Sequence, residues 1–255
     1  MILVIDVGNT NIVLGVYDKE ELVANWRITT QNNRTADETG LLIRSLFSYS
    51  DIDIKDIESV IISSVVPNIM YSLTNGIRKQ LHIEPMIVGA GMKTGINLRM
   101  ENPREMGSNR IVNLVAAKEI YGGPVVVVDY STATMFDVID KNGEFITAIT
   151  APGVQICADA LYQRAAQLPK IEIKKPKSLI VKNTVGSIQA GIVLGHIGQT
   201  IHIIKELKRE LDLPDMKVIA TGGLAKVIDS DKTIFDVLDP TLTLKGLKIL
   251  YEKNK

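Results

Sequence analysis

The sequence predicts an α/β protein made of two duplicated lobes with a cleft between them, residues 1–121 and 122–255. Each half begins with an apolar strand that ends in an acidic residue, Asp6 or Asp129, and two further strands follow as a meander. Each half also contains a later strand–turn–helix unit. A chain of 255 residues can form two half-size cores, and facing lobes create the kind of cleft that usually holds a small-molecule site.

The elements of the first half follow from apolar runs and from residues that begin helices. Apolar, β-branched runs bounded by turn residues predict strands at Ile2–Val7, Ile12–Tyr17, Leu22–Ile28 and Ser59–Val66. A helix should begin near Thr35, because Thr35 and Glu38 form a capping box. Pro67 and Pro103 should each open a further helix, since proline is favoured at the first helical position. The second of these helices should run to about Tyr121.

The second half repeats this order after a break at Gly122-Gly123-Pro124. Apolar runs predict strands at Val125–Val128, Met135–Ile139, Phe145–Thr150 and Met216–Ala220. A long helix is expected over roughly Asn183–Leu211, and shorter helices should start at Leu224 and at Pro240.

Composition narrows the class of protein. Basic and acidic residues number 29 each, so the formal net charge is 0, and no basic block suggests nucleic-acid binding. No apolar run approaches the roughly 20 residues of a membrane-spanning helix, and the N-terminus lacks the features of a secretion signal. Cys157 is the only cysteine, which leaves no disulfide framework. We therefore expect a cytoplasmic protein without a membrane or nucleic-acid partner.

The turn Asp6-Val7-Gly8-Asn9-Thr10 is the strongest single motif. Glycine at a strand-to-strand turn lets the backbone approach a phosphate, and successive N–H groups there can form an anion-binding nest. Asn9 and Thr10 add side-chain donors, and Asp6 can hold Mg²⁺ through water, because Mg²⁺ dehydrates reluctantly. An ordinary hairpin with Asn-Thr turn chemistry is the alternative.

Two motifs of the second half extend this pattern. Asp129 is followed by the small-residue turn Ser131-Thr132-Ala133-Thr134, so each lobe has an acidic strand end and a small turn that could grip a Mg²⁺-polyphosphate. Thr221-Gly222-Gly223 lies between an apolar strand and a helix, which suits close packing against the adenosine half of a nucleotide. A simple helix-entry turn is the alternative for this segment.

Gly107-Ser108-Asn109-Arg110 lies on a helical stretch next to the expected cleft. Arg110 could bind a carboxylate or a phosphate with two parallel hydrogen bonds, or it could form a salt bridge. The Asn109 amide can form hydrogen bonds but cannot accept a proton at neutral pH.

With these motifs in order along almost the whole chain, the sequence closely resembles the type III pantothenate kinases. Further matching segments are Arg34–Glu38, Ser63–Pro67, Lys93–Gly95, Asn102–Glu105, Pro152-Gly153, Leu168-Pro169, Asn183–Val185 and Asp239–Gly246. The resemblance implies an actin-like (ribonuclease H-like) fold, ATP and Mg²⁺, a monovalent cation such as K⁺ or NH₄⁺, and a homodimer. It also implies phosphorylation of pantothenate, the first step toward coenzyme A.

The same resemblance implies roles for individual residues. Asp6 would manage Mg²⁺ and Asp129 the monovalent cation, while Asn109 occupies the position of the general base. The nucleotide and its phosphates would contact Gly8, Asn9, Thr10, Ser131, Thr132, Gly222 and Gly223. The acyl substrate would contact Met100, Gly107, Ser108, Arg110 and Thr184.

Five positions depart from the family pattern, and all are expected near the cleft. Asn109 replaces the aspartate that serves as general base, Met100 replaces a tyrosine near pantothenate, and Ser131 replaces a glycine of the second phosphate turn. Thr147-Ala148 stands in place of a Gly-Gly pair, and Ile201-His202 in place of an Asp-Gly pair. Loss of a general base typically lowers the rate by about 10²–10⁴-fold.

Three functions remain open on the sequence. The first is a type III pantothenate kinase with impaired activity. The second is a catalytically inactive paralogue that binds a nucleotide or a pantothenate-like ligand and acts as a regulator or partner. The third is a kinase for another small hydroxy acid, with Met100 marking a reshaped pocket.

Overall fold

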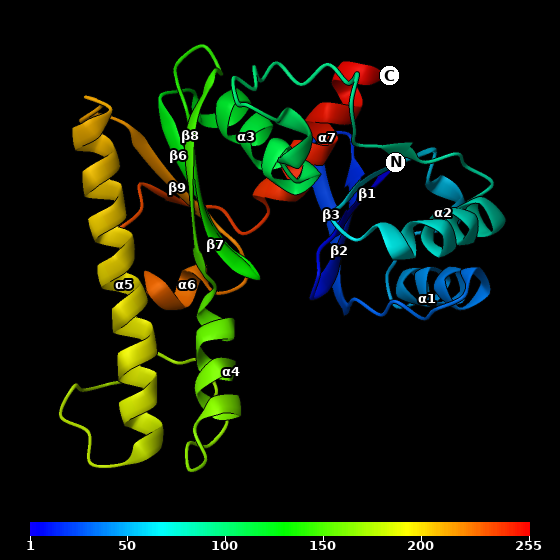
Figure 1. Ribbon diagram of the computed structural model, residues 1–255. Helices are drawn as coiled ribbons and strands as arrows, with labels where there is room; N and C mark the ends of the chain where they lie inside the picture. The colour runs from blue at the N-terminus through cyan, green and yellow to red at the C-terminus, as the bar shows by residue number, and fades with distance from the viewer. The chain divides into compact units, whose positions relative to one another are not determined.

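The computed structural model describes all residues, and they form two compact units. Unit 1 comprises Met1–Ile96, Glu101–Ala116 and Leu242–Lys255, and unit 2 comprises Asn97–Met100 and Ala117–Thr241. Each unit contains one five-stranded sheet with helices packed on it (Figure 1). None of the helices is long and apolar enough to cross a membrane.

The two sheets have the same topology, which confirms the predicted duplication. In unit 1 the order β3-β2-β1-β4-β5 joins Glu21–Thr29, Asn11–Asp18, Ile2–Val7, Ser59–Ser64 and Met86–Ile87. In unit 2 the order β8-β7-β6-β9-β10 joins Phe145–Pro152, Ala133–Ile139, Val125–Tyr130, Lys217–Thr221 and Val237–Leu238. The central strand of each sheet, β1 or β6, pairs antiparallel with the next strand of the meander and parallel with the later strand, β4 or β9.

Side-chain alternation along β1 divides the core of unit 1 into two layers. The helices of this unit are α1 (Ala36–Ser48), α2 (Pro67–Leu81), the first part of α3 (Ser108–Tyr121) and α7 (Leu242–Asn254). Leu3, Ile5 and Val7 pack with α1 and α2, whereas Val4 packs with α3 and α7. Because successive side chains of a strand point to opposite faces, Asp6 lies on the α3 side of the sheet.

Unit 2 follows the same alternation along β6. Its helices are α4 (Val154–Arg164), α5 (Thr184–Glu210) and α6 (Ala225–Ile228). Val126, Val128 and Tyr130 pack in one apolar cluster with Ile192 of α5, and Asp129 therefore lies on the opposite face. The predicted long helix is confirmed as α5, while α4 was not predicted from the sequence.

Polar side chains cap two helices, and the sequence predicted the first of these caps. The hydroxyl of Thr35 accepts a hydrogen bond from the Glu38 N–H at 3.2 Å, and Glu38 Oε2 accepts one from the Thr35 N–H at 2.8 Å. This reciprocal capping box begins α1. At the start of α5, Asn183 Oδ1 accepts a hydrogen bond from the Gly186 N–H at 2.7 Å.

Helix α3 begins later than predicted. Pro103 opens only a 3₁₀ turn, Pro103–Glu105, which the Asn102 side chain caps by accepting from the Arg104 N–H at 3.3 Å. The chain then passes through Gly107, and the α-helix starts at Ser108. A proline marks the start of a turn here, but only the packing of Ser108, described below, sets the start of the helix.

Helix α7 belongs to unit 1, although the sequence analysis grouped it with residues 122–255. It packs over β1, where a Cβ built on Gly246 would lie 2.2 Å from the backbone oxygen of Val112 in α3. The helix begins at Leu242 rather than Pro240. Its placement depends on long-range packing, which local sequence does not reveal.

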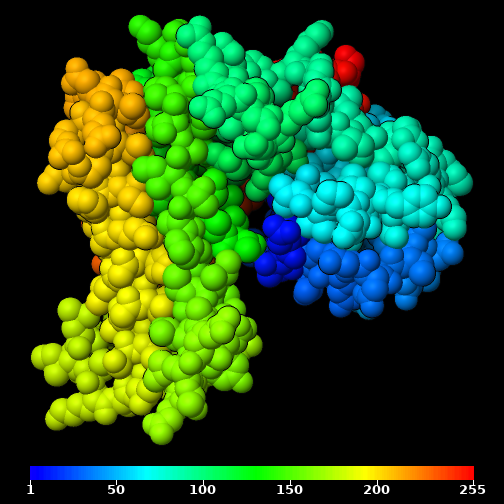
Figure 2. Space-filling view, viewed as in Figure 1, coloured from blue at the N-terminus to red at the C-terminus, as the bar shows by residue number.

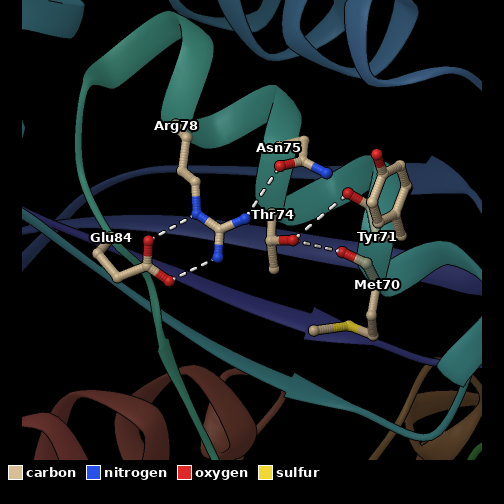
Figure 3. A network of polar contacts seen from close by, with 6 residues as sticks. All are labelled: Met70, Tyr71, Thr74, Asn75, Arg78 and Glu84. Atoms are coloured by element: carbon tan, nitrogen blue, oxygen red, sulfur yellow. Dashed lines mark hydrogen bonds and ion pairs between the residues drawn. The ribbon is translucent and has the colours of Figure 1, made fainter.

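An exposed ion pair fixes the chain after α2 (Figure 3). The guanidinium of Arg78 binds Glu84 with two parallel hydrogen bonds, of 2.6 and 2.7 Å, and Asn75 accepts a third at 3.0 Å. Because both charged side chains are exposed, solvent screens this pair and it contributes little to the stability of the fold. It ties the end of the helix to the segment that leads into β5.

The close approach of α7 to α3 gives a stability prediction. Gly246→Ala should lower the free energy of unfolding by about 1–3 kcal/mol, because the new methyl group overlaps Val112. Gly198→Ala is the matched control, because Gly198 is also inside a helix but its Cβ would meet no atom within 4 Å. Alanine there should raise the free energy of unfolding by about 1 kcal/mol, since it has the higher helix propensity. Urea unfolding measures both changes, and equal effects would contradict the packing argument.

Candidate functional site

Asp6 lies at the end of β1 with a buried, unsatisfied oxygen. In the parallel register of β1 and β4 it stands opposite Ser63, whose hydroxyl donates a hydrogen bond to the carboxylate. The other oxygen, Oδ1, is buried and has no hydrogen-bond partner. Burial raises the pKa of the Asp6 carboxyl to about 6, and the hydrogen bond from Ser63 lowers it in part.

The turn after β1 approaches its neighbours closely. The Gly8 N–H donates to the Asn11 oxygen at 3.0 Å, and a Cβ on Gly8 would lie only 3.1 Å from that oxygen. Thr30 fastens the turn from outside, since its hydroxyl donates to the Gly8 oxygen at 2.6 Å and its N–H to the Thr10 oxygen at 3.0 Å. Asn9 and Thr10 are exposed at the tip. The turn is therefore held in place while its tip remains open to a ligand.

The first turn of α3 is joined to the end of β4. Ser108 Oγ lies 3.0 Å from Ser63 Oγ, accepts from the Ser64 N–H at 3.0 Å and lies 2.9 Å from the Ser64 backbone oxygen. Unit 1 thus brings Asp6, Ser63 and Ser108 together. The sequence predicted Ser108 as a substrate contact, whereas the structure engages its hydroxyl with β4.

Asn109 and Arg110 follow directly in the same turn and are partly buried. Asn109 Oδ1 lies 2.9 Å from the position that a Cβ on Gly107 would take, so only glycine fits there without a shift. The Gly107 oxygen accepts a hydrogen bond from the Arg110 N–H at 3.0 Å. The predicted substrate-binding and base-position residues of this segment are therefore neighbours of the group around Asp6.

Unit 2 contains a similar arrangement around Asp129. Asp129 is buried at the end of β6 and stands opposite Thr221 of β9, as Asp6 stands opposite Ser63. Gly222 follows with φ +94°, and a Cβ there would lie 2.7 Å from Asp129 Oδ1. Both the left-handed backbone and the lack of space require glycine at this position. The neighbouring Gly223 is exposed.

The second small-residue turn packs against the start of α4. Ser131 and Thr132 are exposed, and the Ser131 N–H donates to the Ala133 oxygen at 3.1 Å. A Cβ on Gly153 would lie 2.1 Å from the Thr132 oxygen. The Pro152-Gly153 match in the sequence therefore marks a close backbone contact with this turn.

Thr184 lies in a separate pocket of unit 2, with a volume of about 630 Å³. Its lining residues are Leu161, Leu168, Val181, Lys182, Asn183, Thr184, Ser187, Ile188, Gly191 and Ile192. The pocket thus combines apolar walls with hydroxyl, amide and ammonium groups. Met100 is partly buried in a segment that also belongs to unit 2, where Arg99 pairs with Glu144 at 2.7 Å.

The residues around Asp6 fit a hydrated Mg²⁺. No group of three or more histidine, cysteine, aspartate or glutamate side chains could hold a metal alone. Mg²⁺ in kinases is commonly bound by one or two carboxylates together with waters and substrate phosphates. The buried Oδ1 of Asp6, which lacks a partner, matches that requirement.

Sequence reasoning missed the hydroxyls of Ser63 and Thr221 as parts of the sites. Ser63 was noted only within a matching segment, and Thr221 only as the start of a glycine turn. The sequence did contain a signal, because Ser63 and Thr221 each lie at the end of an apolar strand. Asp6 and Asp129 occupy the corresponding position on the two central strands. Pairing them with Asp6 and Asp129 required the parallel register of the two sheets.

The raised pKa of Asp6 gives a prediction for the protein without metal or nucleotide. The folded state binds more protons than the unfolded chain between about pH 4 and pH 6, so stability should fall as pH rises through that window. Asp6→Asn should remove this loss and raise the free energy of unfolding at pH 7 by about 2–3 kcal/mol.

Urea unfolding between pH 4 and pH 8 measures the effect. Asp18→Asn, at the exposed end of β2, controls for the change in net charge. A parent protein whose stability rises across this window, with no gain from Asp6→Asn, would contradict the burial argument.

Comparison with solved structures identifies the fold. The ethanolamine utilization protein EutJ from Carboxydothermus hydrogenoformans is 16% identical, with a TM-score of 0.59 over 97% of this chain and 89% of that chain. MreB 5 of Spiroplasma citri, solved with AMPPNP, is 12% identical, with a TM-score of 0.57 over 98% and 96%. The ROK hexokinase from Thermus thermophilus is 11% identical, with a TM-score of 0.51 over 98% and 97%. These similarities show two actin-like lobes, as the sequence analysis expected.

The sequence itself matches a family model. The model describes the type III pantothenate kinases and covers residues 2–206. This range includes both acidic strand ends, Asp6 and Asp129, and the Gly107–Arg110 segment. The chain therefore belongs to the type III pantothenate kinase family.

Proposed function

We propose that this protein transfers a phosphoryl group from ATP to the hydroxyl of pantothenate, giving 4'-phosphopantothenate, at a rate limited by Asn109. The buried Oδ1 of Asp6, without a partner beside the Gly8 turn, is the observation that carries the proposal. A hydrated Mg²⁺ would satisfy this oxygen and supply the charge that a transferring phosphoryl group requires. Membership of a kinase family supports the same chemistry.

In this proposal the residues of unit 1 bind and orient the cation, the phosphates and the substrate, and none of them acts as a nucleophile. Asp6 holds the hydrated cation, and donors of Asn9 and Thr10 at the exposed tip of the turn bind phosphate oxygens. Arg110 binds the substrate carboxylate, and Asn109 orients the hydroxyl by a hydrogen bond. Because an amide cannot take the hydroxyl's proton, that proton would pass to an oxygen of the transferred phosphoryl group while ADP leaves, and positioning and electrostatics would lower the barrier.

In unit 2, Asp129 holds a monovalent cation, K⁺ or NH₄⁺, while the Ser131-Thr132 turn and the Gly222-Gly223 turn approach the nucleotide. The exposure of both turns and the tight contact of Gly222 with Asp129 support this assignment. Thr184 contributes a hydroxyl to the acyl substrate from its pocket, whose mixed apolar and polar lining suits a small hydroxy acid.

A second function is a ligand-binding protein without turnover, which acts as a regulator or partner. Asn109 favours it, because the amide lies in the first turn of α3 where the family has a base. In this alternative the group around Asp6 still binds Mg²⁺-nucleotide, and only the chemical step is missing.

The Asn109→Asp variant tests the proposed function. Aspartate has the same size as asparagine and restores a proton acceptor, so ATP-dependent phosphorylation of pantothenate should rise by about 10²–10³-fold. A coupled ADP-release assay with Mg²⁺ and K⁺ measures it. Asn68→Asp, the same chemical change at an exposed position on α2, should leave the rate unchanged.

The outcomes separate the two functions. No turnover in the parent or the variant, together with Mg²⁺-nucleotide binding, would favour the ligand-binding protein. A parent as fast as Asn109→Asp would contradict the limiting role of Asn109. Neither turnover nor nucleotide binding would overturn both proposals.

We also propose a homodimer formed through unit 2. Large apolar side chains are exposed on α4, the following loop and the start of α5, a surface segment coloured green to yellow in Figure 2. They are Ile156, Leu161, Tyr162, Leu179, Ile180 and Val185. An exposed apolar group of this kind usually marks a protein interface.

Ile180→Asp should convert the dimer to a monomer, because Ile180 is 86% exposed within the chain and a charge there would have to be buried in the interface. Sedimentation equilibrium measures the mass. Tyr71→Asp is the control, since Tyr71 is similarly exposed, at 78%, but lies on α2 in unit 1. A parent that is monomeric at micromolar concentration would refute the proposal.

A further inference from the structure

We propose that Ser63 and Ser108 form a two-hydroxyl link that positions Asp6 and ties it to the first turn of α3. Ser63 and Ser108 are then positioning residues, and the carboxylate and Asn109 act as one rigid group. The part of this inference that concerns Mg²⁺ rests on the proposed function, whereas the link itself does not.

The link rests first on burial and geometry. Ser63 is 0% exposed, so its hydroxyl cannot bond to water and must be satisfied within the protein. It has two polar neighbours: Asp6, to which it donates, and Ser108 Oγ at 3.0 Å. Ser108 Oγ in turn accepts from the Ser64 N–H at 3.0 Å.

Proton counting limits the directions of these hydrogen bonds when Asp6 is charged. The carboxylate can only accept, so the Ser63 hydroxyl donates to it, and in the proposed link Ser108 donates to Ser63. The Ser64 N–H completes the series by donating to Ser108. Hydrogen bonds aligned toward one charge strengthen one another. In the alternative, Ser108 donates to the Ser64 backbone oxygen at 2.9 Å, and the contact between the two hydroxyls then carries no hydrogen bond.

The sheet explains why these groups meet. Ser63 stands opposite Asp6 in the register of β1 and β4. Ile61, two residues earlier on β4, packs in the cluster that contains α3, so Ser63 shares that face of the sheet. Unit 2 has the same pairing, because Thr221, only 2% exposed, stands opposite Asp129. A buried hydroxyl beside the acidic residue thus occurs in both units, although the surrounding helices differ.

The link predicts a specific defect in Ser63→Ala. The carboxylate loses its donor, so the Mg²⁺ concentration that gives half-maximal binding of a non-hydrolysable ATP analogue should rise about tenfold. Affinity for the analogue without Mg²⁺ should stay the same, which a general loss of structure would not produce. Ser64→Ala is the matched control, because that hydroxyl bonds to Val66 rather than to Asp6.

Two measurements decide the proposal. Titration calorimetry with the analogue at several Mg²⁺ concentrations compares the parent, Ser63→Ala, Ser108→Ala and the double variant. If the hydroxyls act as one link, the double variant should show less than the product of the two single effects. Hydrogen exchange without ligand should show faster exchange at residues 108–110 in Ser63→Ala but not in Ser64→Ala.

The results that overturn the inference are distinct from failure of the proposed function. An unchanged Mg²⁺ requirement in Ser63→Ala, an equal shift in Ser64→Ala, or independent effects in the double variant would refute it. If the parent binds no Mg²⁺-nucleotide, the proposed function fails, and hydrogen exchange alone decides the link. Unchanged exchange at residues 108–110 would then refute it as well.

Discussion

The parallel pairing of the central strand with the later strand of each sheet is the constraint on which both candidate sites depend. This register sets Asp6 beside Ser63 and Asp129 beside Thr221, in each case at the end where the chain leaves the sheet. Because side chains alternate along a strand, the acidic residue lies on one face of its sheet and the main apolar cluster lies on the other face. Because one register places all of these groups, a shift by one residue would move each acidic side chain to the wrong face.

Close backbone contacts hold the turns that follow these strands. Gly8 lies against its own hairpin, Gly222 against Asp129, and Gly153 against the Thr132 oxygen. At each position a side chain would occupy space that another backbone or carboxylate atom already fills. These glycines therefore fix the backbone around both acidic residues. Ser131 is different, since it carries a side chain at the exposed second turn.

Asp6 lowers the stability of the folded chain when it is ionised without a bound cation. An aspartate at the end of an apolar strand is costly to ionise, and the burial that raises its pKa also leaves Oδ1 without a partner. Such a cost is understandable where a cation arrives with the ligand and satisfies the oxygen. Asn109, in the first turn of α3 in the same unit, carries no such charge and can only form hydrogen bonds.

The sequence by itself determined most of the local elements and the duplication, because these depend on neighbouring residues. Apolar runs located the longer strands, the Thr35–Glu38 capping box began α1, and Asn183 began α5. Only the tertiary structure decided that α7 joins unit 1, that α3 begins at Ser108, and that Ser63 donates a hydrogen bond to Asp6. Each of these depends on strand register or on helix packing between segments 45 or more residues apart, such as Ser63 and Ser108. Local propensity carries no information about such contacts, since they are selected by shared burial and by hydrogen bonds that form only when the sheet is complete.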